Sequence, residues 1–254
     1  MALASLIKDL NFDRYDRNAR LQPALLVLLP AFLMIGIWYP AARTGSGWVA
    51  WVLVACGATF MLAQATRRRG RAVEQAWGDR IGRRHSARLL SFEDHTLSPS
   101  YKERIADWIS RHGPGLPTHE EERLNPRSAE DRRLTAVKWL LEATRADAAG
   151  SMLLAENVSY GFWRNMLGLR PIGITVGVAS IVCDAFLLWR VGVADARFWP
   201  GTAFLAGAVA AVIAWAFLVS RRSVEDASLA FAERLFAQID NPVVTQRLAA
   251  SARD

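Results

Sequence analysis

Charged residues are almost absent from four long stretches of this 254-residue chain. The stretches cover roughly residues 21–39, 48–64, 172–193 and 202–220. Lys and Arg are missing from their interiors, and Asp184 is their only acid. Because a helix needs about 20 apolar residues to cross a bilayer, these stretches predict four membrane-spanning helices, the second slightly short.

Cysteine is also scarce, with only Cys56 and Cys183, both inside predicted spans. Two such residues cannot form a disulfide framework, nor a cysteine-based zinc site without other ligands. We expect both to be small, buried apolar side chains.

Motifs for catalysis and metal binding are missing. The chain has no GxxxxGK, GxGxxG, HExxH or GxSxG sequence. Its four histidines follow no zinc-site spacing and are expected on a solvated surface: His85, His95, His112 and His119. We therefore predict no catalytic residue, metal, cofactor or direct nucleic-acid binding, which favours a non-enzymatic role without excluding an enzyme.

Positive charge is what the chain does have, with a formal net charge of +7. Most of the basic residues next to the predicted spans fall on one side: Lys8, Arg14, Arg17, Arg20, Arg67, Arg68, Arg69, Arg71, Arg164, Arg170, Arg221 and Arg222. The two short connecting loops hold only Arg43 and Arg197, with Arg190 near a membrane edge. Since Lys and Arg mark the cytoplasmic side, both termini and the middle segment are predicted to be cytosolic, in a bacterial inner membrane.

The predicted fold is an all-α membrane protein with four transmembrane helices in two hairpins and a helical cytosolic insert. Its segments are a cytosolic N-terminal amphipathic segment, hairpin 1, the insert, hairpin 2 and a cytosolic C-terminal helix: residues 1–20, 21–64, 65–170, 171–220 and 221–254. Leu3, Leu6, Ile7 and Leu10 have helical spacing, so the N-terminal segment is either an interfacial helix or a helix packed on the insert.

Start and stop signals divide the insert into helices. Residues 101–112 should form a helix that Ser98-Pro99-Ser100 opens and Gly113-Pro114-Gly115 ends. Residues 73–81 are a further candidate that continues the second span, and 113–127 is predicted to be an exposed loop.

Two longer helices complete the insert. The first covers 128–145, with Ser128 at its N-terminus and a buried stripe of Leu134, Val137 and Leu141. The second covers 151–169 and ends before Pro171, which would open the third span.

A basic run follows the second span directly, made of Arg67, Arg68, Arg69 and Arg71. Next to a membrane, such charges attract anionic lipid by about 1 kcal/mol each. We interpret the run as a lipid-facing anchor that also fixes topology; binding of an anionic ligand is the alternative.

Polar residues gather just before the third span. Glu156, Tyr160 and Arg164 have the i, i+4, i+8 spacing of one helical face, and Asn157 begins a neighbouring stripe with Gly161 and Gly168. Two interpretations stay open. The group of Glu156, Asn157, Tyr160 and Arg164 either binds a ligand and couples the insert to the spans, or is a structural network that ties them together.

Asp184 lies near the middle of the third predicted span. An acid at that depth is costly and faces a partner, a cavity or a pore. It would either line a conductive path, in a ring with copies from other subunits of a homo-oligomer, or be a neutral carboxyl bonded to a neighbouring helix.

The layout of two spans, a helical insert of roughly a hundred residues and two further spans resembles the four-span membrane effectors of bacterial nucleotide-signalled antiphage systems, and segment 156–168 is similar to theirs. The resemblance implies an effector that senses or docks a cytosolic nucleotide signal or protein partner and perturbs or permeabilises the membrane. It assigns no role to any single residue. The alternative is a membrane-anchored scaffold that recruits a soluble partner.

Overall fold

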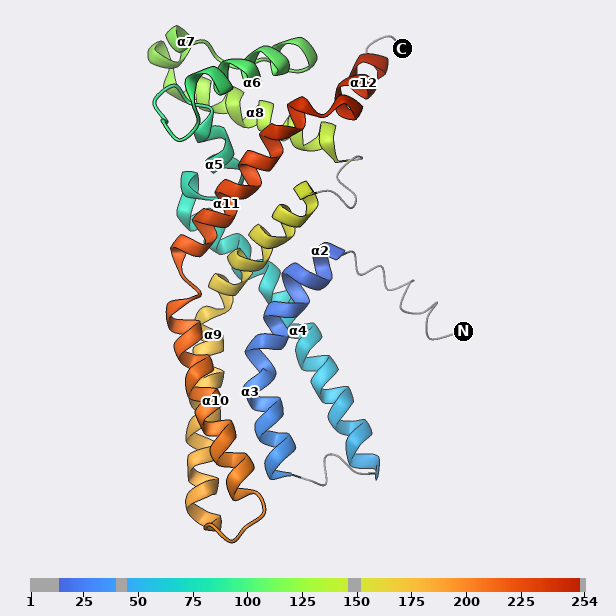
Figure 1. Ribbon diagram of the computed structural model, residues 1–254, viewed down its shortest axis with the longest axis vertical. Helices are drawn as coiled ribbons and strands as arrows, with labels where there is room; N and C mark the ends of the chain where they lie inside the picture. Colours follow the sequence, from blue (N-terminus) through green and yellow to red (C-terminus); the bar gives the residue numbers. More distant parts are fainter. Residues whose placement is uncertain (1–13, 40–44, 146–151, 252–254) are drawn as a thin grey trace. The chain divides into compact units, whose positions relative to one another are not determined.

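The computed structural model describes residues 14–39, 45–145 and 152–251, and over these residues all regular structure is helical (Figure 1). They form two compact units. The first takes the described parts of 1–73 and 161–223, and the second those of 74–160 and 224–254. The predicted amphipathic positions Leu3 to Leu10 and the loop residue Arg43 lie outside the described residues.

Four helices are long and apolar enough to cross a membrane, which confirms that part of the prediction. They are α3 (Gln22–Trp38), α4 (Gly45–Trp77), α9 (Met152–Val191) and α10 (Phe198–Phe217). Large apolar side chains cover their outer faces; Met61 is 74 % exposed and Phe217 is 76 % exposed. Apolar surface on this scale suits a lipid environment, where burial inside the protein is not needed.

The two cysteines also point outward. Both Cys56 on α4 and Cys183 on α9 are exposed, so the expectation that they pack in the protein interior was wrong. A helix that crosses a bilayer can place small apolar side chains against lipid as readily as against another helix, and the sequence does not separate the two faces.

Helix α9 is continuous through Pro171, so the predicted break at this residue was wrong. Proline removes one helical hydrogen bond, but neighbouring groups in spanning helices can compensate. The Thr175 hydroxyl donates to the Pro171 carbonyl over 2.9 Å, and the Arg170 guanidinium donates to the Ala216 carbonyl over 2.8 Å. The Thr175 bond lies in the turn after the proline, and the Arg170 bond ties the residue before it to α10.

Helices α9 and α10 run antiparallel in close contact. A Cβ added to Gly173 would lie 2.8 Å from the Trp215 ring, and one added to Gly177 would lie 2.5 Å from Val212. Small residues permit this approach where apolar burial gives no driving force. A cluster from α3, α9 and α10 and the residues just beyond α10 fills the interior of the first unit: Val27, Met166, Leu169, Trp215 and Val219.

Two short elements lead into α3. Helix α2 (Arg14–Asp16) passes into a π-helical turn, η1 (Arg17–Leu21), in which the Gln22 N–H donates to the Arg17 carbonyl. π-helical turns of this kind are rare and often mark functional sites.

Besides the end of α4 (from Glu74) and the start of α9 (to Tyr160), the second unit is built from shorter helices. They are η3 (Gly78–Arg80), α5 (Gly82–Leu89), α6 (Pro99–His112), α7 (His119–Leu124), α8 (Pro126–Thr144), α11 (Arg221–Phe236, from Val224 on), η4 (Ala237–Asp240) and α12 (Pro242–Ser251). Fully buried Ile81, Leu89, Ile105, Ile109 and Leu140 belong to its core. The predicted helix at 101–112 is α6, and Gly113 ends it as expected.

The predicted loop at 113–127 contains α7. Thr118 and Glu121 form a capping box, in which each side chain accepts from the other residue's backbone N–H. This Thr-x-x-Glu pattern is a recognised helix start, and it was present in the sequence.

The N-terminus and buried face of α8 also differ from the prediction. Asn125, not Ser128, caps the helix, and its side chain accepts from the Ser128 N–H. The buried face includes Ala136 and Leu140 beside Val137, whereas Leu134 and Leu141 are half-buried. The C-terminal segment, expected as one helix, is divided at Asn241-Pro242 into α11 and α12.

Candidate functional site

Asp184 is the centre of the polar site in the first unit. The Trp38 indole N–H donates to its Oδ1 over 2.7 Å, and the residue is 0 % exposed. Its Oδ2 has no hydrogen-bond partner among the described residues. Gly201 makes room for the pair, since a Cβ there would lie 3.0 Å from the Trp38 ring. Helices α3, α9 and α10 therefore meet at this carboxyl group.

A salt bridge in the α9–α10 connection adjoins the same tryptophan. Arg197 donates to both carboxylate oxygens of Asp195, over 2.9 and 2.7 Å, and these bonds lower the pKa of Asp195 to about 2. The Arg197 guanidinium lies 5.5 Å from the Trp38 ring centroid, within cation–π range. Trp38 thus contacts a fixed cation through its ring face and the buried acid through its N–H.

The hydrogen bond from Trp38 on α3 is the bond to a neighbouring helix that one of the two interpretations of Asp184 expected. The carboxyl group faces the chain's own helices rather than the outer surface of the first unit. The sequence gives no sign of the pairing between Trp38 and Asp184, because the two residues are 146 positions apart.

The predicted coupling residues all lie on α9, but they divide between the units. Tyr160 is 5 % exposed and stacks on Phe231 in the second unit, with ring centroids 6.2 Å apart. Glu156 and Asn157 are half-buried residues of that same unit, whereas Arg164 belongs to the first. Neither unit contains all four.

Asn165, the next residue, holds a position that the prediction did not single out. It is 1 % exposed, and its Nδ2 donates over 2.6 Å to the Ala19 carbonyl in η1. Asn165 therefore satisfies a carbonyl of the π-helical turn and ties α9 to the segment that leads into α3.

Glycines surround this asparagine at the contact between α4, α9 and η1. A Cβ at Gly70 would collide with the Asn165 amide, and one at Gly161 would lie 2.6 Å from the Tyr15 hydroxyl. A Cβ at Gly168 would lie 2.9 Å from the backbone of Arg69. The spacing of Gly161 and Gly168 in the sequence was the available signal for this close approach.

The arginines of the predicted lipid anchor have exposed side chains. Arg67, Arg68, Arg69 and Arg71 are exposed on α4, and the buried Gly70 lies between them.

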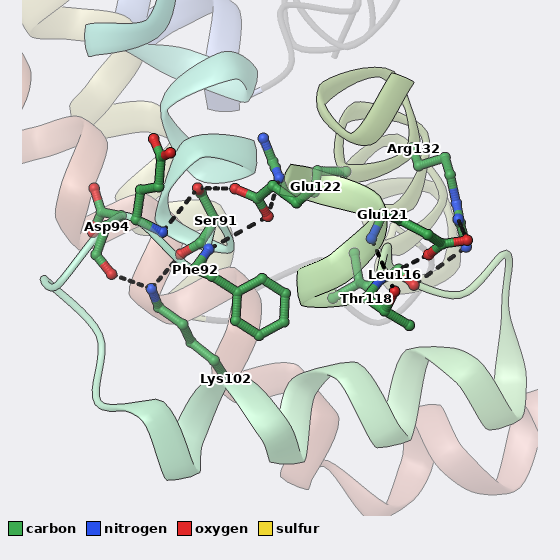
Figure 2. Close-up of polar contacts among 11 residues, drawn as sticks. Ser91, Phe92, Asp94, Lys102, Leu116, Thr118, Glu121, Glu122 and Arg132 are labelled. Atoms are coloured by element: carbon green, nitrogen blue, oxygen red, sulfur yellow. Dashed lines mark hydrogen bonds and ion pairs between the residues drawn. The ribbon is translucent and has the colours of Figure 1, made fainter. Parts of the chain in front are cut away.

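A network of buried charges lies in the second unit (Figure 2). Glu122 and Arg133 form an ion pair of 2.6 Å with side chains only 9 % and 8 % exposed. The Ser91 hydroxyl donates to Glu122, and the Phe92 N–H donates to its other oxygen over 3.4 Å. Residues 113–127 were predicted to be an exposed loop, but α7 turns Glu122 toward α8 and buries it.

Lys102 extends the network. Its ammonium group donates to the Ser91 carbonyl over 2.5 Å and to the Asp94 carbonyl (Figure 2). Glu122 and Arg133 compensate each other's charge, and backbone carbonyls accept from Lys102, which indicates a structural network holding the α5–α6 turn onto α7 and α8.

His85 is buried, contrary to the prediction, while His95 and His119 are exposed and His112 is half-buried. Its Nδ1 lies 2.9 Å from the Ser228 hydroxyl oxygen, which also accepts from the Gly82 N–H over 2.9 Å. Burial, assisted by the positive charge of Arg88, lowers the pKa of His85 to about 4. The ring is therefore neutral at pH 7.

Over the part of the chain that the structure describes, no three His, Cys, Asp or Glu side chains are grouped to hold a metal ion. Comparison with protein-family models, curated proteins and solved structures gave no match.

Proposed function

We propose that this chain is a multi-pass effector of the bacterial inner membrane that perturbs or permeabilises the bilayer when a cytosolic signal or partner acts on it. In this proposal the four apolar helices form two transmembrane hairpins, and the helical insert and both termini are cytosolic. A role in antiphage defence follows from the resemblance in layout.

The observation that carries the proposal is the half-satisfied carboxyl group of Asp184. It is fully buried among apolar helices, with one oxygen bonded to Trp38 and the other without a partner in the described structure. A buried polar atom without a partner costs about 1–3 kcal/mol. A state in which water reaches Asp184 would remove that cost. In the proposal the described arrangement is therefore the closed state of the conductive path, and Asp184 favours opening of the path once Trp38 moves away.

Induction in a bacterial host, followed with a voltage-sensitive dye, tests this role. We expect the wild-type chain, with its trigger or when overproduced, to depolarise the membrane. Asp184→Asn retains the size and a hydrogen-bonding group but favours hydration less, so it should depolarise the membrane at least several-fold more slowly.

Cys183→Ser is the matched control, because Cys183 is the preceding residue and is exposed. It should depolarise the membrane as the wild type does. Equal depolarisation by Asp184→Asn and wild type, at equal membrane abundance, would remove Asp184 from the mechanism.

The second candidate is a membrane-anchored scaffold that recruits a soluble partner. It is favoured by the separate buried core of the second unit, which includes Ile105, Ile109 and Leu140. Replacing the four spans with unrelated ones separates the candidates: a scaffold would keep its activity, and an effector acting through its spans would lose it.

A further inference from the structure

The exposed face of α4 changes from apolar to basic along the helix axis. Residues seven apart lie almost above one another, since seven residues make nearly two helical turns. Two apolar series run along α4 and end in arginine, Leu53–Phe60–Arg67 and Val54–Met61–Arg68, and a third series with a polar middle residue, Gly57–Gln64–Arg71, also ends in arginine.

Burial separates this face from the packing face of the same helix. Leu53, Val54, Phe60 and Met61 are 67 %, 63 %, 53 % and 74 % exposed, and the three arginines are exposed as well. The opposite face carries the buried Thr59, Ala63, Thr66 and Gly70. The series therefore belong to one continuous surface that the described residues of the first unit leave uncovered.

The dimensions match a lipid leaflet. One step of seven residues rises about 10 Å and two steps about 21 Å, against a half-thickness of about 15 Å for the hydrocarbon core. The arginines thus lie at the level of the headgroup of a lipid whose acyl chain packs beside the apolar series. A guanidinium binds phosphate oxygens through paired N–H groups.

We propose that Arg67, Arg68 and Arg71 form a binding site for the headgroup of an anionic phospholipid whose acyl chains lie along the apolar series of α4. None of the three makes an ion pair with another described residue. Arg69 is outside the site, because it lies a further 100° around the helix and its backbone packs on Gly168. The site requires α4 to cross the bilayer, but it does not require permeabilising activity.

The apolar series favour lipid over other occupants. A soluble anion would use the arginines and leave Leu53 to Met61 uncovered. A second copy packed in parallel through the same face would bring its own three arginines against these and be repelled.

Lipid binding to the purified full chain in detergent tests the proposal. Native mass spectrometry would compare phosphatidylglycerol with phosphatidylcholine of the same acyl chains. The wild type should bind phosphatidylglycerol more tightly. R67Q/R68Q/R71Q should weaken that binding roughly 100-fold, as expected for about 1 kcal/mol from each of three charges, and leave phosphatidylcholine unchanged.

The matched control is R111Q/R123Q/R127Q, which removes the same charge from three exposed arginines of the second unit. It should keep phosphatidylglycerol binding within about threefold of wild type if the effect is local rather than from net charge. R67K/R68K/R71K preserves the charge needed for membrane insertion and should give an intermediate loss, because Lys lacks the planar fork.

Three results would overturn the site. They are equal binding of the two lipids by the wild type, equal losses in the two glutamine triple variants, and full competition by soluble glycerol phosphate. The last would assign the arginines to a free anion. None of these measurements uses depolarisation. The lipid site can therefore be refuted without refuting the effector proposal, and the effector proposal can be refuted without refuting the lipid site.

Discussion

Two adjacent ion pairs in the second unit have the same chemistry and opposite burial. Glu121–Arg132 (Figure 2) is 2.8 Å long with side chains 51 % and 43 % exposed. The side chains of Glu122–Arg133 are only 9 % and 8 % exposed. Exposed pairs contribute about 0–1 kcal/mol. Removing one partner of a buried pair is far more costly, because the remaining charge stays in the interior without compensation.

We therefore expect Arg133→Met to lower the free energy of unfolding by roughly 3–5 kcal/mol, and Arg132→Met by less than about 1 kcal/mol. Urea denaturation of the detergent-solubilised chain, followed by circular dichroism, measures both. Adding Glu122→Leu to Arg133→Met should restore much of the loss. Similar losses for the two single variants would show that burial is not the deciding factor.

His85 should make stability depend on pH. Its pKa is about 4 in the folded chain, below the ordinary 6.5, so the folded state binds fewer protons than the unfolded state. The contribution of neutral His85 to the free energy of unfolding is complete above pH 6.5 and is lost as the pH falls from 6.5 toward 4.

His85→Asn keeps a neutral hydrogen-bonding group near Ser228 and cannot take up a proton. We expect the melting temperature of this variant to fall less between pH 7 and pH 4 than that of the wild type. His95→Asn, at an exposed position, should follow the wild type. Parallel curves for all three chains would mean that His85 does not titrate in this range.

At the scale of elements, glycines determine how closely the helices of the first unit approach. Gly168 on α9 faces the backbone of Arg69 on α4, which a side-chain rotation cannot move. A Cβ added to Gly57 on α4 would have no atom within 4 Å other than those of the adjacent residues and the backbone of the same helical turns. The same substitution should therefore have opposite effects at the two positions.

Gly168→Ala should lower the stability of the first unit by about 1–3 kcal/mol through overpacking. Gly57→Ala should leave it unchanged or raise it by up to about 1 kcal/mol, since Ala favours helix more than Gly does. Thermal melting in detergent micelles gives both values. A stable Gly168→Ala variant would show that α4 and α9 can separate freely at this contact.

Local patterns in the sequence predicted individual elements well. The four apolar stretches and the Pro99 start and Gly113 end of α6 depend on neighbouring residues alone, and the structure agrees with them. The capping box of Thr118 and Glu121 was equally readable, and overlooking it left α7 as a loop.

Contacts between distant segments could not be predicted in this way. Glu122 and His85 resemble solvated residues in the sequence and are buried only because Arg133 and Ser228 lie opposite them. Pro171 looked like a helix boundary, but α9 continues through it, and the neighbouring Arg170 bonds to a carbonyl of α10. For Asp184 the sequence indicated a special environment without identifying Trp38 as its partner.

At the scale of the whole molecule, the distribution of arginines predicts the orientation in the membrane. The α9–α10 connection should lie outside and the insert inside. In a chain whose native cysteines are replaced by serine, Ala196→Cys should react with an impermeant maleimide in spheroplasts. Ser110→Cys on α6 should react only after the membrane is opened.

Both positions are exposed in the structure, so a difference in labelling reports the side of the membrane rather than burial. Labelling of Ser110→Cys alone would reverse the orientation. Labelling of both in intact spheroplasts would show that α6 and the α9–α10 connection are on the same side.

The Trp38–Asp184 hydrogen bond also has a consequence for biosynthesis. The ribosome completes α3 long before α9, because 146 residues separate the two partners. An acid entering the bilayer core costs about 2.5–3.5 kcal/mol on insertion scales. The indole N–H of α3 must therefore already be in the membrane as the hydrogen-bond donor for Asp184 when α9 inserts, and a chain that lacks α3 would expose Asp184 to lipid without this donor.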